Sequence, residues 1–258
     1  MRKILIALLL LSTFLVSYNG STKEKDEATV SHTDTLKQEN PNTKQDTLKP
    51  VFGYRFVING DFDGDGKKEK LIEHFVSGID NKETNKFYEG LTDYEQLIEL
   101  TVKKNPISFV VSDNKRIDTL HIFSGGQQLG LSYLKNEGDL NGDGTDEVSY
   151  VINWADQSNI NTWHLVSYKN NKWTEIYSFP IWDWQLPDLP QTCNQYELFG
   201  LDNKIINTNN DTVNIRLEKE LINFKGLVKK IKTNKIQVIF MNEAAEEDTM
   251  IVDLKQLK

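Results

Sequence analysis

The sequence has little cysteine, histidine or proline. Its 258 residues include one cysteine, four histidines and six prolines. The single thiol, Cys193, excludes a framework of internal disulfides, and we interpret it as a small buried residue. A hydrolytic site needs a nucleophile and a base, and the histidines that could serve are few and scattered: His32, His74, His121 and His164.

Signatures of catalysis and of nucleic-acid binding are also missing. No Gly-x-Ser-x-Gly, His-Glu-x-x-His or phosphate-loop pattern occurs in the sequence. The formal net charge is −8, whereas a nucleic-acid-binding surface would be basic. We therefore expect no nucleic-acid partner, and the sequence favours a non-catalytic protein over an enzyme.

One apolar run stands out, and it is short. Residues 4–16 are apolar apart from a Ser-Thr pair, and Arg2 and Lys3 precede them. A bilayer-spanning helix needs about 20 apolar residues, so this run is too short to span. The pattern is typical of an export signal, which we place at residues 1–18. It predicts a protein exported to the periplasm or cell surface of a bacterium.

The end of the signal resembles a bacterial lipoprotein box. Leu15-Val16-Ser17 matches its first three positions, but Tyr18 stands where the lipid-bearing cysteine is required. A thioether cannot form at tyrosine, so the residue contradicts the lipidation that the pattern suggests. We expect membrane attachment only through the signal or a lipid anchor.

A polar segment separates the signal from the folded part. Residues 19–50 consist mainly of Ser, Thr, Lys, Asp, Glu, Gln and Asn. Such a composition buries too little apolar surface to offset the entropy of ordering, so it predicts a disordered tether. The remainder, residues 51–258, is expected to form one β-rich calcium-binding domain, for the reasons that follow.

Two nine-residue segments, 61–69 and 139–147, share one pattern of side-chain oxygens. Each has oxygen-bearing side chains at positions 1, 3, 5 and 9 and glycine at position 6. A hard cation such as calcium takes six to eight oxygen ligands at about 2.3–2.6 Å, and a tightly curled loop aims alternate carboxylates inward. Glycine at position 6 permits backbone angles that a side chain would forbid. The pattern predicts two calcium sites. The alternative is a pair of solvated Asp-Gly turns.

The spacing also indicates the type of calcium loop. The helix-loop-helix hand requires glutamate at position 12, where this chain has Ile72 and Tyr150. The pattern Asp-x-(Asp/Asn)-x-Asp-Gly-x-x-(Asp/Glu) before a strand instead resembles the FG-GAP or VCBS repeats of integrin-like propellers and secreted bacterial proteins. That family more often ends the loop with Asp, where both copies here have Glu. The resemblance implies calcium ligands at Asp61, Asp63, Asp65, Lys67 (carbonyl) and Glu69, and at Asp139, Asn141, Asp143, Thr145 (carbonyl) and Glu147.

The expected fold is mainly β, either propeller-like or an irregular β-repeat fold. Residues 71–76 are assigned to a strand because of the family resemblance, since their apolar positions would also suit a helix. Residues 78–95 are expected to form a long loop or a short helix. The other strand-like runs are 54–58, 98–102, 107–111, 119–123, 131–134, 148–152, 162–168, 173–179, 236–241 and 249–254, with hairpins around 170–171 and 242–248.

The C-terminal part is expected to include an amphipathic helix. Apolar residues recur every three or four positions from Leu217 to Ile231, although Gly226 weakens the pattern. Residues 216–235 hold seven Lys or Arg against two Glu. This polar face suits either solvent beside an acidic body or an anionic membrane surface.

Two functions remain open from the sequence. The first is an exported, non-catalytic binding or structural module in which calcium is structural and the partner is an unknown protein or glycan at the cell surface; we expect a monomer. The second is a calcium-dependent carbohydrate-binding or glycan-processing protein that uses Trp182 and Trp184. These tryptophans also suit an irregular connection held in the core by its aromatic rings.

Overall fold

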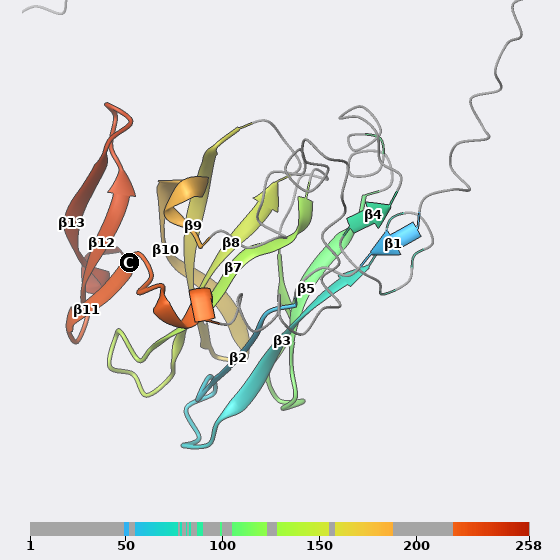
Figure 1. Ribbon diagram of the computed structural model, residues 1–258. Coiled ribbons are helices and arrows are strands. Elements are labelled where there is room, and N and C mark those ends of the chain that lie inside the picture. The colour runs from blue at the N-terminus through green and yellow to red at the C-terminus, as the bar shows by residue number, and fades with distance from the viewer. Residues whose placement is uncertain are drawn as a thin grey trace, which may run out of the picture. The chain divides into compact units, whose positions relative to one another are not determined.

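The computed structural model describes residues 49–51, 55–76, 105–122, 128–154, 158–187 and 219–257, together with positions 78, 81, 83, 87–89 and 99 (Figure 1). The predicted signal, nearly all of the predicted tether, Cys193 and most of the predicted strand at 98–102 lie outside these residues. Among the helices that the structure describes, none combines the length and apolar character needed to cross a bilayer.

The described residues are mainly β-strand, as predicted. The helical elements among them are a single turn at 219–223, two 3-10 turns and residue 99, which has a π-helical conformation within the predicted strand at 98–102. The elements are β1 (Lys49–Val51), β2 (Val57–Gly60), β3 (Glu69–Val76), β4 (Phe87–Glu89), β5 (Ile107–Ser112), β6 (Leu120–His121), β7 (Gln128–Gly138), β8 (Glu147–Trp154), β9 (Ile160–Lys169), β10 (Lys172–Trp182), η4 (Asp183–Gln185), β11 (Val228–Lys232), β12 (Lys235–Met241), β13 (Glu247–Asp253) and η5 (Leu254–Leu257).

The strands form three larger antiparallel sheets. The first sheet has the order β2-β3-β5-β6, the second β7-β8-β9-β10 and the third β11-β12-β13, while β1 pairs with β4. The first and second sheets are both four-stranded, and each joins its first two strands through one of the acidic loops. The two copies of the sequence motif are therefore the same connection in two equivalent sheets. None of these sheets in the described part closes into a barrel.

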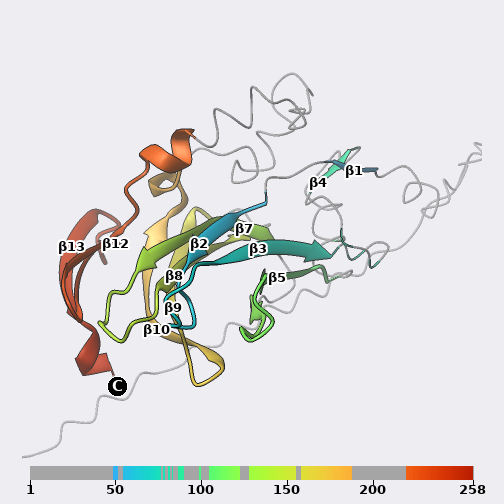
Figure 2. The same ribbon diagram turned by 90° about the horizontal axis from the view of Figure 1, so that it is seen from below.

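The second sheet lies between the first and the third in both views (Figures 1 and 2). Its first strand, β7, packs against β2, β3 and β5 of the first sheet, and its last strand, β10, contacts β12 of the third. One continuous apolar core runs through all three sheets. Its largest fully buried side chains include Trp163, Phe62 and Leu71.

A buried glutamate on β3 connects the first sheet to the second. Along β3 the side chains alternate between inside and outside, and Glu73 occupies an inner position with 1% of its surface exposed. Its Oε2 accepts the N–H of Phe56 at 3.1 Å, and its Oε1 accepts the N–H of Leu131 on β7 at 2.8 Å. The carboxylate thus satisfies main-chain donors from both sheets.

Both predicted hairpins are confirmed. The turn between β9 and β10 is Asn170-Asn171, and both residues have positive φ (53° and 59°), as a tight type I′ connection requires. The C-terminal hairpin consists of β12 and β13, joined across residues 242–246.

The predicted C-terminal helix is wrong beyond its first turn. The helical turn covers 219–223, Gly226 then adopts φ +79°, and Val228 to Lys232 form strand β11. A positive φ ends a right-handed helix, and glycine adopts it without steric cost. The apolar residues that suggested one helix belong to two elements. Phe224 follows the helical turn and packs edge-on against Tyr133, whereas Val228 and the residues after it form β11.

Two smaller boundaries also differ from the prediction. Strand β1 includes residues 49 and 50, which were assigned to the tether, because Lys49 pairs with Glu89 in the β1–β4 ladder. The predicted loop or short helix at 78–95 therefore contains a strand, β4.

Removing the buried carboxylate of Glu73 is expected to destabilise the protein strongly. Glu73→Ala leaves two buried N–H groups without their acceptor, which costs about 3 kcal/mol of unfolding free energy. Urea unfolding followed by tryptophan fluorescence measures this change. Glu246→Ala, at an exposed position, is the matched control and should change stability by less than about 0.5 kcal/mol. A loss below about 1 kcal/mol for Glu73→Ala would contradict the bridging role.

Candidate metal centre

The two acidic loops, 61–69 and 139–147, have the same internal hydrogen-bond pattern. In the first loop, the N–H groups of Phe62, Asp65, Gly66 and Lys67 donate to Glu69, Asp63, Asp61 and Asp65 at 3.0, 3.2, 2.9 and 2.9 Å. In the second loop, those of Leu140, Asp143, Gly144 and Thr145 donate to Glu147, Asn141, Asp139 and Asp143 at 2.6, 2.8, 3.3 and 3.1 Å. The repeat in sequence is therefore a repeat in conformation.

Glycine is required at two positions of each loop. The predicted position, Gly66 and Gly144, has φ of 83° and 92°. Position 4, Gly64 and Gly142, also has positive φ, at 74° and 79°. The sequence analysis missed position 4, although the shared Gly-x-Gly of both loops was a visible signal for it.

Each loop is anchored to the core by the apolar residue at position 2. Phe62 is fully buried and Leu140 is 1% exposed. Their N–H groups also hold Glu69 and Glu147 at the beginning of β3 and β8. Position 9 is therefore fixed relative to the loop by both burial and hydrogen bonding.

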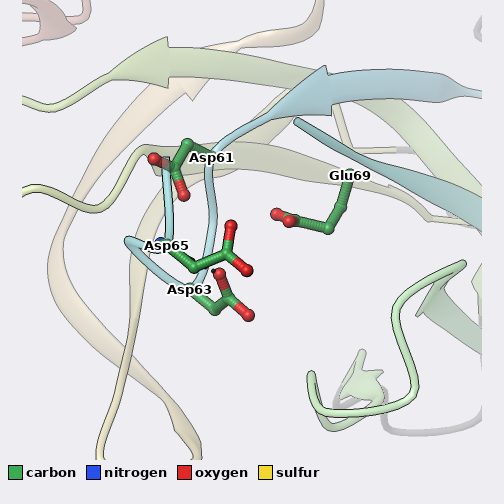
Figure 3. Close-up of side chains that lie close together, drawn as sticks. All are labelled: Asp61, Asp63, Asp65 and Glu69. Atoms are coloured by element: carbon green, nitrogen blue, oxygen red, sulfur yellow. Dashed lines mark hydrogen bonds between the residues drawn. The ribbon is translucent and has the colours of Figure 1, made fainter. Parts of the chain in front are cut away.

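The first loop brings four carboxylates together. One ligand oxygen from each of Asp61, Asp63, Asp65 and Glu69 lies within 4.8 Å of the others. Figure 3 shows the Glu69 side chain pointing from β3 toward the three aspartates of the loop. Oxygens on opposite sides of a calcium ion are about 5 Å apart, so this spacing fits a hard divalent cation.

A buried oxygen atom without a hydrogen-bond donor also favours a bound cation at the first loop. Asp61 Oδ1 is buried, and no hydrogen-bond donor in the described part of the chain reaches it. Burial raises the pKa of Glu69, against the hydrogen bond from Phe62, and the neighbouring aspartates act in the same direction as burial. Negative charge is concentrated here, and a bound cation would relieve the repulsion.

The second loop is held more tightly by its own hydrogen bonds. Glu147 is fully buried and accepts bonds from the N–H groups of Leu140 and Asn141 and from Asn141 Nδ2, the last at 2.6 Å. Burial raises its pKa to about 7, against these hydrogen bonds. Among the described residues, Asp139, Asp143 and Glu147 do not form a compact ligand group like that of the first loop.

A cation from the following hairpin contacts the carboxylate at position 5 of each loop. Arg116, between β5 and β6, lies 2.5 Å from Asp65 and 3.1 Å from Asp63. Lys169, at the end of β9, lies 3.1 Å from Asp143. The sequence analysis missed both cations, because each lies 26 or more positions from its partner in the sequence.

These contacts lower the pKa of Asp65 and of Asp143. The hydrogen bond from Arg116 lowers the pKa of Asp65, with the N–H of Lys67 adding to the effect. Burial opposes the shift at Asp143, but hydrogen bonds from Thr145 and Lys169 lower its pKa. Both aspartates are thereby held in the ionised form that metal binding requires.

At position 7 the predicted ligand is the main-chain carbonyl, and the side chains of Lys67 and Thr145 contact the carboxylate at position 5. The ammonium group of Lys67 is 3.9 Å from Asp65, and its side chain is 82% exposed. The Thr145 hydroxyl donates to Asp143 at 2.6 Å.

The two loops also touch each other. The N–H of Asp61 donates to the Asp146 carboxylate at 3.1 Å, and the N–H of Asp146 donates to the Asp61 carbonyl at 2.8 Å. A cleft of about 370 Å³ lies beside them, and its walls include Asp65, Arg116, Asp143 and Lys169. Position 5 of both loops, with its cation, therefore faces a common space.

The second sequence candidate, the tryptophan pair, lies at the end of β10. The rings of Trp182 and Trp184 stack at 4.2 Å with an angle of 14° between their planes. Trp184 is 64% exposed. Trp184 therefore does not serve as the buried aromatic anchor that was one reading of this segment.

No protein-family model, curated protein or solved structure matches this chain. The resemblance to FG-GAP or VCBS repeats therefore depends on the two loops and the strands beside them.

Removing the cation beside the first loop is expected to weaken the metal-free protein. Arg116→Gln leaves the carboxylates of Asp63 and Asp65 without their nearest positive charge, so the melting temperature in chelator should fall. The decrease should shrink at high salt, because salt screens exposed charges. Lys115→Gln, at the adjacent exposed position, is the control and should melt like the wild type. An unchanged melting temperature for Arg116→Gln at low salt would contradict this role.

Proposed function

We propose that this chain is a calcium-binding β-repeat protein of the FG-GAP or VCBS type. In this proposal it is exported to the bacterial cell envelope and acts there as a non-catalytic binding or structural module. The observation that carries the proposal is the first loop, where four carboxylates converge within 4.8 Å beside a buried oxygen without a donor. The matching conformation of the second loop extends the proposal to two sites.

Calcium would be held by the carboxylates of Asp61, Asp63, Asp65 and Glu69, with the Lys67 carbonyl as a further oxygen ligand. In the second loop the corresponding groups are Asp139, Asn141, Asp143, Glu147 and the Thr145 carbonyl. The ion supplies positive charge where packed carboxylates repel one another. Its contribution is structural, since each loop joins the first two strands of a sheet and the loops touch.

The first site is expected to bind calcium more tightly than the second. It offers four carboxylates, whereas the second offers three and an amide. The Asn141 amide and the Glu147 carboxylate also hydrogen-bond to each other, and calcium must break this contact. Both effects lower the affinity of the second loop.

Calcium is expected to raise the melting temperature of the protein. At about 2 mM calcium, a site in the weak range of extracellular modules contributes about 1–2 kcal/mol of stability by mass action. Calorimetric titration should find two ions in the wild type and one in Asp65→Asn, which removes a charge but keeps an acceptor for the Lys67 N–H.

Asp113→Asn is the matched control for Asp65→Asn. The Asp113 carboxylate also accepts a backbone N–H, from Lys70 at 2.9 Å, but it lies outside the loop. This variant should still bind two ions. If the wild type melts at the same temperature in calcium and in chelator, the loops are turns and the proposed function is wrong.

The alternative function is carbohydrate binding at the tryptophan pair. It is favoured by one specific observation, the exposed ring of Trp184 stacked on Trp182. An aromatic face of this kind can stack against the apolar face of a sugar ring. Near this pair, Asp183 accepts a hydrogen bond from Asn161 at 2.9 Å, which fixes the turn that presents the rings.

If this alternative holds, a glycan from a panel of neutral and acidic oligosaccharides should quench tryptophan fluorescence in a saturable manner. Trp184→Ala should abolish the quenching, and Trp184→Tyr should retain part of the affinity because a phenol ring can still stack. Absence of quenching across the panel would exclude the tryptophan pair as a glycan site.

A further inference from the structure

A second cavity, larger than the inter-loop cleft, lies between the β9–β10 hairpin and the C-terminal turn η5. Its volume is about 750 Å³, within the range of small-molecule sites in proteins. Three segments that are distant in sequence form its walls: position 3 and position 5 of the second loop, the two strands of the hairpin, and the third sheet with η5. The cavity depends on the folded arrangement of all three.

The floor of the cavity is apolar. Ile176 on β10 packs against the core, and Leu254 at the start of η5 is 7% exposed. Leu257, at the other end of η5, is 46% exposed and lines the same cavity. An exposed leucine beside the buried Leu254 and the half-buried Ile176 offers a surface that a ligand can cover.

The rim of the cavity carries unpaired positive charge. Its two acidic residues already have partners: Asp143 contacts Lys169 at 3.1 Å, and Glu175 contacts His164 at 2.6 Å. Two further rim cations, Lys172 and Lys255, are exposed and form no ion pair with any described residue. The rim therefore has two ammonium groups without an ion-pair partner among the described residues, while each of its two carboxylates contacts another side chain.

We propose that this cavity binds a small organic anion with an apolar body, such as an aromatic or alkyl compound with one acidic group. The apolar body lies on Ile176, Leu254 and Leu257, and the acidic group lies between Lys172 and Lys255. Asn170 on the rim supplies an amide group for a further hydrogen bond. Charge complementarity selects an anion over a neutral ligand of the same shape.

The groups that select the anion are separate from the proposed calcium ligands, although Asn141 and Asp143 of the second loop line part of the cavity. Lys172, Lys255 and the apolar floor are not calcium ligands, and the charges that select the ligand are already free in the metal-free structure. The inference therefore holds or fails separately from the proposed function.

Two fluorescent probes with the same aromatic body test the site. The full chain is titrated with 8-anilino-1-naphthalenesulfonate, which is anionic, and with N-phenyl-1-naphthylamine, which lacks the sulfonate. Each titration is made in chelator and repeated with calcium, and the melting temperature of every variant is measured to confirm folding. The wild type should bind the anionic probe saturably, at one site, and more tightly than the neutral one.

The double variant Lys172→Gln/Lys255→Gln should weaken the anionic probe about tenfold, because two charge contacts at a solvent-exposed rim are lost. Its affinity for the neutral probe should not change. Leu257→Ser should weaken both probes, since it removes part of the apolar floor. Lys115→Gln, an exposed lysine outside the cavity, is the charge-matched control and should leave both affinities unchanged.

Three results would overturn the proposal. They are no saturable binding by the wild type, equal affinity for the two probes, or unchanged anionic affinity in the double lysine variant. Two calcium ions bound without any anion site would reject this inference alone. Anion binding without a calcium effect would reject the proposed function alone.

Discussion

Buried carboxylates that accept main-chain N–H groups connect the first two sheets and their loops. Glu73 accepts N–H groups from Phe56 and from Leu131, which belong to different sheets. Glu69 and Glu147 accept those of Phe62 and Leu140, the residues that anchor the two loops in the core. A buried carboxylate is costly unless it is hydrogen-bonded, and removing either partner leaves an unsatisfied group. The loops and the sheets are therefore stabilised by the same type of contact.

The burial of these glutamates also places like charges close together in the loops. Each loop concentrates acidic groups beside a buried glutamate, and burial raises the pKa of both Glu69 and Glu147. The structure offsets part of the repulsion with one cation for each loop, Arg116 or Lys169, placed at position 5. A divalent ion inside the loop would offset far more. In the first loop, Arg116 reduces the repulsion at Asp65, and a cation bound by the four convergent carboxylates would reduce the repulsion among all of them.

The mainly β fold and the shared conformation of the two loops could be predicted from the sequence, because turn chemistry and glycine positions are local signals. It could not identify β3 from its period, since two of the four inward positions of that strand are Glu69 and Glu73 rather than apolar residues. The opposite error occurred near Gly226, where apolar residues from a helical turn and a strand happened to follow a helical period. The contacts of Arg116 and Lys169 could not be predicted for a third reason. Each cation follows or ends the third strand of its sheet, and it meets its aspartate only once the sheet has formed.

The third sheet contacts the second acidic loop through the turn between β11 and β12. The second loop holds the first through Asp146 and Asp61, and the tight turn between β11 and β12 holds the second in turn. At that turn the N–H of Asn234 donates to the Leu140 carbonyl at 2.9 Å, and Asn234 Nδ2 donates to the Asn141 carbonyl at 2.7 Å. Lys230 on β11 also contacts the Asp139 carbonyl. Asn234 and Lys230 thus bond to main-chain carbonyls of the second loop, as Asp146 bonds to the main-chain carbonyl of Asp61 in the first. The second loop is therefore held both by the first loop and by the turn between β11 and β12.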